Sequence, residues 1–165
     1  MKCPAAMTVA PMMTGLGPVE RIAAAAEKID AEFVLALGSA DASGLDLPDN
    51  VRSVGYVPLG PLLATSTAVI HHGGAGTTLT ALDAGVPQIV VPQGADGPIN
   101  AAAVAAAGCG FDVATDALDG PVIERLLAEE SLRVEAARVR AEMHAMPSPA
   151  AVAERLTKYF GGQIS

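Results

Sequence analysis

Aromatic residues, cysteines and basic residues are all scarce in this sequence of 165 residues. Aromatic residues make up only 3%, with no tryptophan, so a core must be built from aliphatic side chains; 51% of the chain is hydrophobic. The ten Lys and Arg residues are scattered, and the formal net charge is −8. Binding to a nucleic-acid duplex needs phosphate-neutralising Lys and Arg on one face. The composition therefore argues against a nucleic-acid partner.

The cysteines and the short apolar runs exclude further classes of protein. Cys3 and Cys109 lie far apart and form no C-x-x-C motif, which argues against a disulfide framework or a zinc site. The longest apolar run, residues 101–107, is far shorter than the ~20 residues that a membrane-spanning helix needs. The opening of the chain makes a poor signal peptide. We therefore expect a cytoplasmic protein with reduced thiols and no membrane segment.

Short apolar runs alternate with longer helical patterns along the whole chain, and this alternation predicts a parallel sheet with helices on both faces. The expected strands are residues 7–10, 33–37, 51–54, 68–71, 88–91 and 111–113. The expected helices are residues 18–29, a brief one after the turn at 55–61, then 77–84, 99–107 and 118–159, the last broken at 147–149. No linker divides the chain, so we predict one α/β domain with a doubly wound, Rossmann-like sheet over residues 1–165.

Ligands of such sheets bind outside the carboxyl ends of the strands, which directs attention to the glycine-rich turn HHGGAGTT at residues 71–78. Glycines allow a close approach of the backbone to a ligand. The N-terminus of the following helix offers unpaired N–H groups and a partial positive charge to an anion. The turn lacks the Lys of a Walker A loop and is no G-x-G-x-x-G fingerprint. Taken alone, it fits phosphate binding and tight packing equally well.

A longer pattern surrounds this turn. The stretch from Leu47 to Asn100 reads LPDNVRSVGYVPLGPLLATSTAVIHHGGAGTTLTALDAGVPQIVVPQGADGPIN, and residues 147–149 add P-S-P. It closely resembles the donor-binding signature of GT-B glycosyltransferases, and most of all that of bacterial enzymes that attach deoxysugars to natural products. The resemblance covers roughly residues 30–160 and implies a single C-terminal half-domain of the GT-B fold.

This resemblance implies which residues of the turn contact the donor. His72 is expected to bind the diphosphate. Gly74, Ala75, Gly76 and Thr77 are expected to add main-chain and hydroxyl donors. His71 precedes the matched position, and we expect its side chain to point into the interior.

The resemblance also implies contacts to the base, the ribose and the sugar. Tyr56 and Val57 are expected beside the nucleobase, although Tyr56 could instead pack in an interface. Asp96 matches an acid that binds hydroxyls of the donor sugar, since a carboxylate can accept two hydrogen bonds; the alternative is a solvated loop acid. Thr80 stands on the ribose side, where plant relatives carry Glu, and a Thr there favours a TDP-sugar over a UDP-sugar.

Some positions depart from the family pattern. Gly97 stands where relatives usually carry Gln, so one sugar contact is expected to be missing. The opening stretch MKCPAAMTVAPMMTGLG is unlike the usual first strand and loop, which puts a phosphate contact from Thr14 in doubt. The sequence contains no D-x-D motif, so neither a bridging metal ion nor a cofactor is implied.

The general base of the family lies in a separate N-terminal acceptor domain, and nothing in this sequence resembles that domain. His144 lies outside the donor motif and is expected to be a solvated surface residue. We therefore expect donor binding and leaving-group stabilisation for a metal-independent, inverting sugar transfer to a small-molecule hydroxyl, with no catalytic residue in this chain and no activity of the chain alone.

Several alternatives remain open at this point. The chain can be the excised C-terminal domain of a longer enzyme, which its irregular opening favours, or the donor subunit of a two-chain enzyme. It can also be a non-catalytic binding protein of the same fold, or an epimerase of GT-B architecture, which matches the motif less closely. The sugar, the acceptor and the oligomeric state are not encoded in these motifs.

Overall fold

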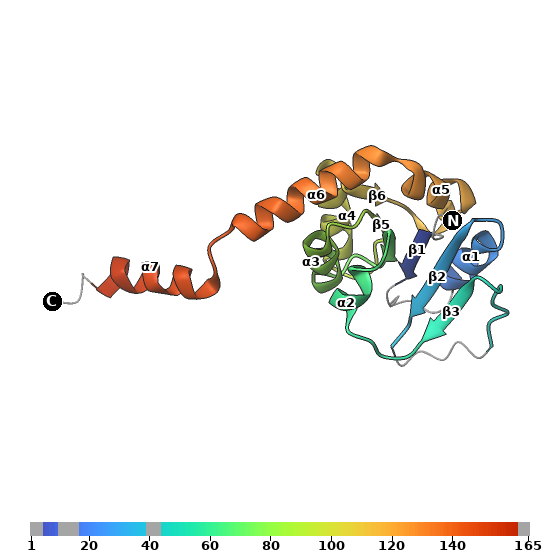
Figure 1. The fold of residues 1–165 in the computed structure, drawn as a ribbon, viewed down its shortest axis with the longest axis horizontal. Coiled ribbons are helices and arrows are strands. Elements are labelled where there is room, and N and C mark those ends of the chain that lie inside the picture. Colours follow the sequence, from blue (N-terminus) through green and yellow to red (C-terminus); the bar gives the residue numbers. More distant parts are fainter. Residues whose placement is uncertain (1–4, 10–16, 39–43, 162–165) are drawn as a thin grey trace.

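The structure is a computed structural model that describes residues 5–9, 17–38 and 44–161. Its strands are β1 (Ala5–Val9), β2 (Ala31–Ala36), β3 (Val51–Val54), β4 (Ala68–His71), β5 (Gln88–Val90) and β6 (Gly110–Asp112). Its helices are α1 (Gly17–Ala26), α2 (Leu59–Leu63), α3 (Ala75–Ala84), α4 (Gly97–Ala106), α5 (Gly120–Ala128), α6 (Glu130–Ala145) and α7 (Pro149–Gly161), with a short 3-10 helix, η1 (Thr115–Ala117). Figure 1 shows the chain as a ribbon.

The six strands form one sheet in the order β3-β2-β1-β4-β5-β6, and all five neighbouring pairs are parallel. This order confirms the predicted doubly wound, Rossmann-like sheet. The direction of winding reverses between β1 and β4, which pair along Val9 and Ile70. In sheets of this kind a ligand binds at that reversal, beyond the carboxyl ends of the strands. The turn that follows β4 therefore occupies the predicted place.

The core has two sides because successive strand residues point to opposite faces of the sheet. Ile70 and Ile89 are fully buried in the main apolar cluster, together with residues of α1 and α5. Val69 and Val90 point to the other face and belong to two smaller clusters. One of these involves α2 and α3, and the other involves α4 and α6. Both faces of the central strands are thus covered by helices, which explains their nearly continuous apolar sequences.

Several helix boundaries differ from the prediction, and each has a local cause. α1 ends at Ala26 rather than at Ile29. The side-chain amide of Asn50 donates to the carbonyl oxygens of Ala26, Ile29 and Ala31, at 2.8, 3.2 and 2.9 Å. Asn50 thereby supplies donors to a helix end whose carbonyl groups lack helical partners.

The expected long helix from Leu118 is interrupted. Asp119 caps α5 with its carboxylate, which accepts from the N–H of Val122 at 3.1 Å, and the extended backbone of Glu129 separates α5 from α6. The predicted break at 147–149 is confirmed, because α7 begins at Pro149.

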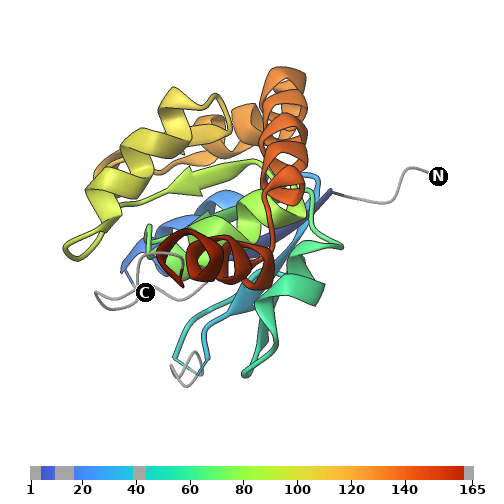
Figure 2. The same ribbon diagram turned by 90° about the vertical axis from the view of Figure 1, so that its left-hand side faces the viewer.

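Helix α7 stands clear of the sheet and its covering helices in Figure 1, and it faces the viewer in Figure 2. It contains no buried residue, and Leu156, Tyr159 and Phe160 are exposed. In the part of the chain that the structure describes, no helix is long and apolar enough to cross a membrane.

Candidate functional site

The turn after β4 leads into the N-terminus of α3 at the reversal of the sheet. The helix begins at Ala75, two residues earlier than predicted, and its first helical bond runs from the N–H of Thr78 to the carbonyl of Gly74 at 3.0 Å. The N–H groups of Ala75, Gly76 and Thr77 therefore lack partners within the helix. Gly74 is the N-cap and provides no capping side chain. This end of α3 thus offers main-chain donors and a partial positive charge to an anion.

Asp96 lies against this turn although it is distant in sequence. Its Oδ2 accepts from the N–H of Ala75 at 3.1 Å and from the side-chain amide of Asn100 at 3.3 Å. The loop after β5 therefore supplies the carboxylate that Gly74 cannot supply at the helix end. The structure thereby brings the residue expected to bind sugar into direct contact with the loop expected to bind the diphosphate.

Gly73 adopts a φ of +90°, a conformation that L side chains rarely adopt. A Cβ atom at this position would lie 2.9 Å from both the Cα of Gly97 and a methyl carbon of Val90. Gly97 is itself buried, and a Cβ there would lie 3.1 Å from the carbonyl oxygen of His72. The absence of a side chain at Gly97 thus permits the close packing of the two loops.

His71 is fully buried, as expected. Its Nδ1 accepts from the N–H of Gly73 at 3.0 Å, so its proton lies on Nε2, which donates to Oε1 of Gln88 at 2.8 Å. Burial lowers the pKa of His71 from 6.5 to about 4; the bond to Gln88 acts in the opposite direction, and the neighbouring His72 lowers it further. His71 is therefore neutral at physiological pH and holds one defined tautomer.

His72 is half-buried at the start of the turn. Its carbonyl oxygen accepts from the N–H of Gln93 at 2.9 Å. A Cβ built on Gly74 would lie 2.6 Å from its Nε2. The imidazole therefore lies directly against Gly74, the residue that caps α3.

A cavity of about 220 Å³ lies next to this turn at the carboxyl ends of β2 and β3. Its lining consists of Ala36, Gly38, Gly55, Tyr56, Val57, Leu59 and Thr77. The two residues expected at the nucleobase thus share one cavity with Thr77 of the expected diphosphate loop. Tyr56 is 89% exposed, so its ring forms an open wall of the cavity. Thr80 lies one turn further along α3, where its hydroxyl donates to the carbonyl of Gly76 at 2.7 Å.

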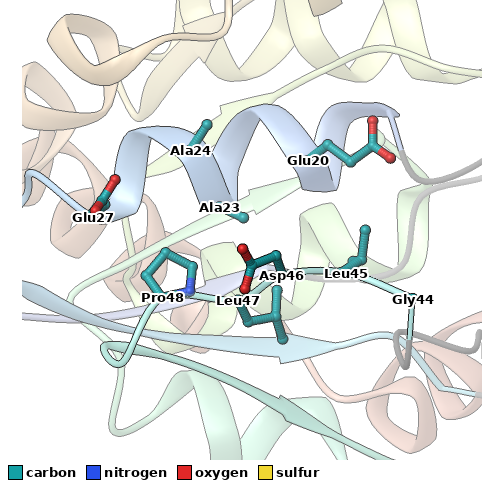
Figure 3. A pocket seen from close by; sticks show the side chains of 9 residues that line it. All are labelled: Glu20, Ala23, Ala24, Glu27, Gly44, Leu45, Asp46, Leu47 and Pro48. Carbon is teal, nitrogen blue, oxygen red and sulfur yellow. The ribbon is translucent and has the colours of Figure 1, made fainter.

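A larger cavity of about 460 Å³ lies elsewhere, between α1 and the segment 44–48 (Figure 3). Glu20 and Glu27 project from α1, and Asp46 lies on the facing segment. This acidic lining disfavours an anionic ligand. Among residues 5–9, 17–38 and 44–161, no group of three or more His, Cys, Asp or Glu side chains is arranged to hold a metal ion.

Two polar residues of the site, Gln88 and Asn100, were not predicted from the sequence. Gln88 is fully buried in a strand that otherwise contains Ile and Val, and such a polar residue among apolar ones was the available signal. Asn100 follows Asp96 by one helical turn of α4, and its amide also donates to the carbonyl oxygen of Gly73 at 2.7 Å.

Two residues discussed earlier, Thr14 and His144, have different outcomes. Thr14 lies outside the described residues. His144 lies on α6 with a half-exposed side chain, and its Nε2 is 2.8 Å from the carboxylate of Asp83 on α3.

Comparison with known protein families identifies the group to which this fold and this site belong. The family model of the erythromycin biosynthesis protein CIII-like C-terminal domain matches residues 20–159. The chain belongs to this family. The matched region spans α1 to α7 and includes the turn after β4, so the CIII-like assignment covers the whole candidate site.

Individual members and solved structures agree with this assignment. The elloramycin glycosyltransferase ElmGT of Streptomyces olivaceus is 45% identical over 148 residues, which cover 89% of this chain and 38% of that protein. The crystal structure of the glycosyltransferase SnogD from Streptomyces nogalater has a TM-score of 0.80 at 44% identity, and the match covers 94% of this chain and 42% of SnogD.

A third comparison concerns a solved complex. The spinosyn rhamnosyltransferase SpnG complexed with thymidine diphosphate has a TM-score of 0.82 at 34% identity, with 94% of this chain and 46% of SpnG covered. This chain therefore spans less than half the length of each of these relatives. It corresponds to the C-terminal half-domain of the GT-B fold.

Proposed function

We propose that this chain binds the nucleotide-sugar donor of a natural-product glycosyltransferase. The observation that carries the proposal is the junction of an anion-binding helix end with a base-sized cavity through Thr77, in a CIII-like domain. The spinosyn rhamnosyltransferase in complex with thymidine diphosphate supports a nucleoside diphosphate as the ligand class.

The diphosphate is placed at the N-terminus of α3. The N–H groups of Gly74, Gly76 and Thr77 and the imidazole of His72 donate to its oxygens, and Ala75 lines the same helix end with its N–H on Oδ2 of Asp96. This arrangement needs no metal ion, because the helix end and the imidazole supply positive potential.

The nucleoside is placed in the cavity beside Tyr56 and Val57. We further propose that TDP is preferred to UDP. The hydroxyl of Thr80 already donates to the carbonyl of Gly76, so it has no proton to offer to a ribose 2′-hydroxyl and gains little from one. The additional methyl group of thymine can pack against the apolar lining of the cavity.

The sugar is placed over Asp96. A carboxylate has two oxygens with about four lone-pair sites, so Oδ1 can accept from sugar hydroxyls while Oδ2 remains on the N–H of Ala75. The two contacts orient the sugar relative to the diphosphate.

The reaction is an inverting transfer to a hydroxyl group of a small natural product. A bond forms between the acceptor oxygen and the anomeric carbon as the bond from that carbon to the β-phosphate oxygen breaks. Negative charge develops on the departing diphosphate, and the end of α3 with His72 stabilises it. The acceptor proton passes to a base in an N-terminal acceptor domain or subunit, so this chain alone transfers no sugar. We place this reaction in the cytoplasm.

The test is titration calorimetry of the chain with TDP, together with NMR shifts of the main-chain amides. Binding should shift the amides of residues 74–77 and those of Tyr56 and Val57. An assay with a TDP-sugar and an acceptor should show no transfer by the chain alone. Absence of TDP binding, or shifts confined to the acidic cavity beside α1, would contradict the donor-site proposal. Sugar transfer by the isolated chain would contradict the half-enzyme proposal.

A further inference from the structure

Both main-chain polar groups of Gly73, its N–H and its carbonyl oxygen, form hydrogen bonds with side chains. Its N–H donates to Nδ1 of His71 at 3.0 Å, and its carbonyl oxygen accepts from the side-chain amide of Asn100 at 2.7 Å. His71 ends β4, whereas Asn100 lies on α4. The residue at the bend of the turn is therefore anchored to the sheet on one side and to a helix on the other.

The bond from Gly73 depends on the tautomer of His71, and Gln88 controls that tautomer. Because Oε1 of Gln88 accepts from Nε2 at 2.8 Å, the proton stays on Nε2 and Nδ1 remains an acceptor. Gln88 is fully buried. Its Nε2 is the buried side-chain polar atom without a hydrogen-bond partner in the described part of the chain.

An unpaired buried amide lowers stability. An apolar pair at positions 71 and 88 would avoid this loss and would join the two apolar clusters that flank the pair on this face of the sheet. Packing alone therefore does not explain the His71–Gln88 pair. The pair is explained if it fixes the conformation of the turn at Gly73.

We propose that His71, Gln88 and Asn100 are positioning residues that clamp the Gly73 peptide and thereby aim the main-chain donors of residues 74–77 at the diphosphate. The inference rests on the proposed function and names residues that act on its phosphate loop without touching the ligand. Fixing the loop before binding removes an ordering cost, and affinity rises accordingly.

The turn geometry provides a conservative variant for the test. The bond from Gly73 back to the side chain of His71 spans two residues, which is the spacing of an Asx turn. In His71→Asn, Oδ1 can replace Nδ1 as the acceptor, whereas His71→Leu removes the acceptor. Asn100→Ala removes the bond to the carbonyl oxygen of Gly73, together with the longer bond to Oδ2 of Asp96. It leaves the buried core intact, so it also tests the proposal if His71→Leu does not fold.

The chain offers a matched control in Asn50. Its amide also donates to main-chain carbonyls, but it lies at the end of α1 and away from the turn. Asn50→Ala should lower the unfolding midpoint without changing nucleotide affinity.

The experiment titrates the wild-type chain and each variant with TDP and with thymidine, which lacks phosphates, and follows both by NMR. His71→Leu and Asn100→Ala should each weaken TDP binding by roughly tenfold, with thymidine binding unchanged. His71→Asn should bind TDP within about threefold of the wild type, as expected when the Asx-type acceptor is retained.

Two results would overturn the inference. One is wild-type TDP affinity in both His71→Leu and Asn100→Ala. The other is an equal loss for TDP and thymidine, which indicates general loosening. If the wild-type chain itself fails to bind TDP, the proposed function is wrong, and the positioning role of His71, Gln88 and Asn100 fails with it. The wild-type titration thus separates the two failures.

Discussion

Two cavities in the described part of the chain, one beside α1 and one beside Tyr56, differ in size, and the smaller of these two carries the candidate site. The cavity beside α1 measures about 460 Å³ and is lined by Glu20, Glu27 and Asp46. The cavity beside Tyr56 measures about 220 Å³, but it adjoins the end of α3 and its unpaired N–H groups. Recognition of a diphosphate depends on fixed donors and positive potential, so volume alone is a poor guide to the site.

The largest difference between the two regions should appear when one methyl group is added to a glycine in each. In Gly73→Ala, a Cβ would lie 2.9 Å from Val90 and Gly97, at a φ of +90°. We expect a loss of about 2–5 kcal/mol of unfolding free energy, from strain plus overpacking, and no detectable TDP binding.

The control is Gly44→Ala in the acidic cavity, where a Cβ would meet nothing within 4 Å. Its unfolding free energy should stay within about 0.5 kcal/mol of the wild type. Urea denaturation and TDP titration check both variants. Equal effects in the two would contradict the tight packing described for the turn.

Acid should lower the free energy of unfolding through His71, the last residue of β4. Burial lowers the pKa of His71 to about 4, against 6.5 when unfolded. The unfolded chain therefore binds more protons than the folded one between these values, and the contribution of His71 to stability is complete above pH 6.5 and lost as pH falls to 4. The loss should reach roughly 3 kcal/mol.

Other groups also titrate in this interval, so the measurement is a difference between two proteins. Urea unfolding at pH 7 and pH 4 should give a smaller fall for His71→Asn than for the wild type. Identical falls in the two proteins would show that His71 does not titrate as described.

His72→Ala should weaken TDP binding by about 1–3 kcal/mol, the usual range for losing a charge-assisted contact, with little change in unfolding temperature. Asp46→Asn in the acidic cavity should leave TDP affinity unchanged. Calorimetry decides the matter. If affinity is unchanged and His72→Ala unfolds much earlier than the wild type, the histidine is structural.

The smallest expected effect concerns the choice of nucleotide. TDP should bind at least as well as UDP, by up to about 1 kcal/mol for one buried methyl group. Thr80→Glu should shift the preference toward UDP, since a carboxylate accepts from a 2′-hydroxyl. Competition of the two nucleotides, followed by NMR, measures both. A clear preference of the wild type for UDP or GDP would contradict the deoxysugar interpretation while leaving the donor site in place.

Much of the fold could be predicted from local pattern. The strands at 51–54 and 68–71 match β3 and β4 residue for residue, because each is an apolar run with clear turn residues beside it. The turn after β4 was located because glycines and a following helix are both visible in sequence. Helix ends were less predictable: α1 stops where Asn50, which is distant in sequence, reaches its carbonyl groups.

The parts of the site that could not be predicted from the sequence depend on contacts between segments distant in the chain. The bond from Ala75 to Asp96 joins residues that are 21 positions apart, and no spacing rule connects them. Gln88 and Asn100 were missed for the same reason, since their roles depend on which strand and which helix lie beside the turn. The resemblance predicted a sugar contact for Asp96, but only the fold places its Oδ2 on the N–H of Ala75.

Helix α7 has a thermodynamic consequence for the chain as a whole. It buries no residue, and a helix of 13 residues that gains no burial is marginal in water. Its helix–coil equilibrium is therefore uncoupled from the cooperative unfolding of the sheet. We expect heating to melt α7 separately from the sheet and its covering helices. A helical circular-dichroism signal sums both, while the amides of β4 and β5 report the sheet alone.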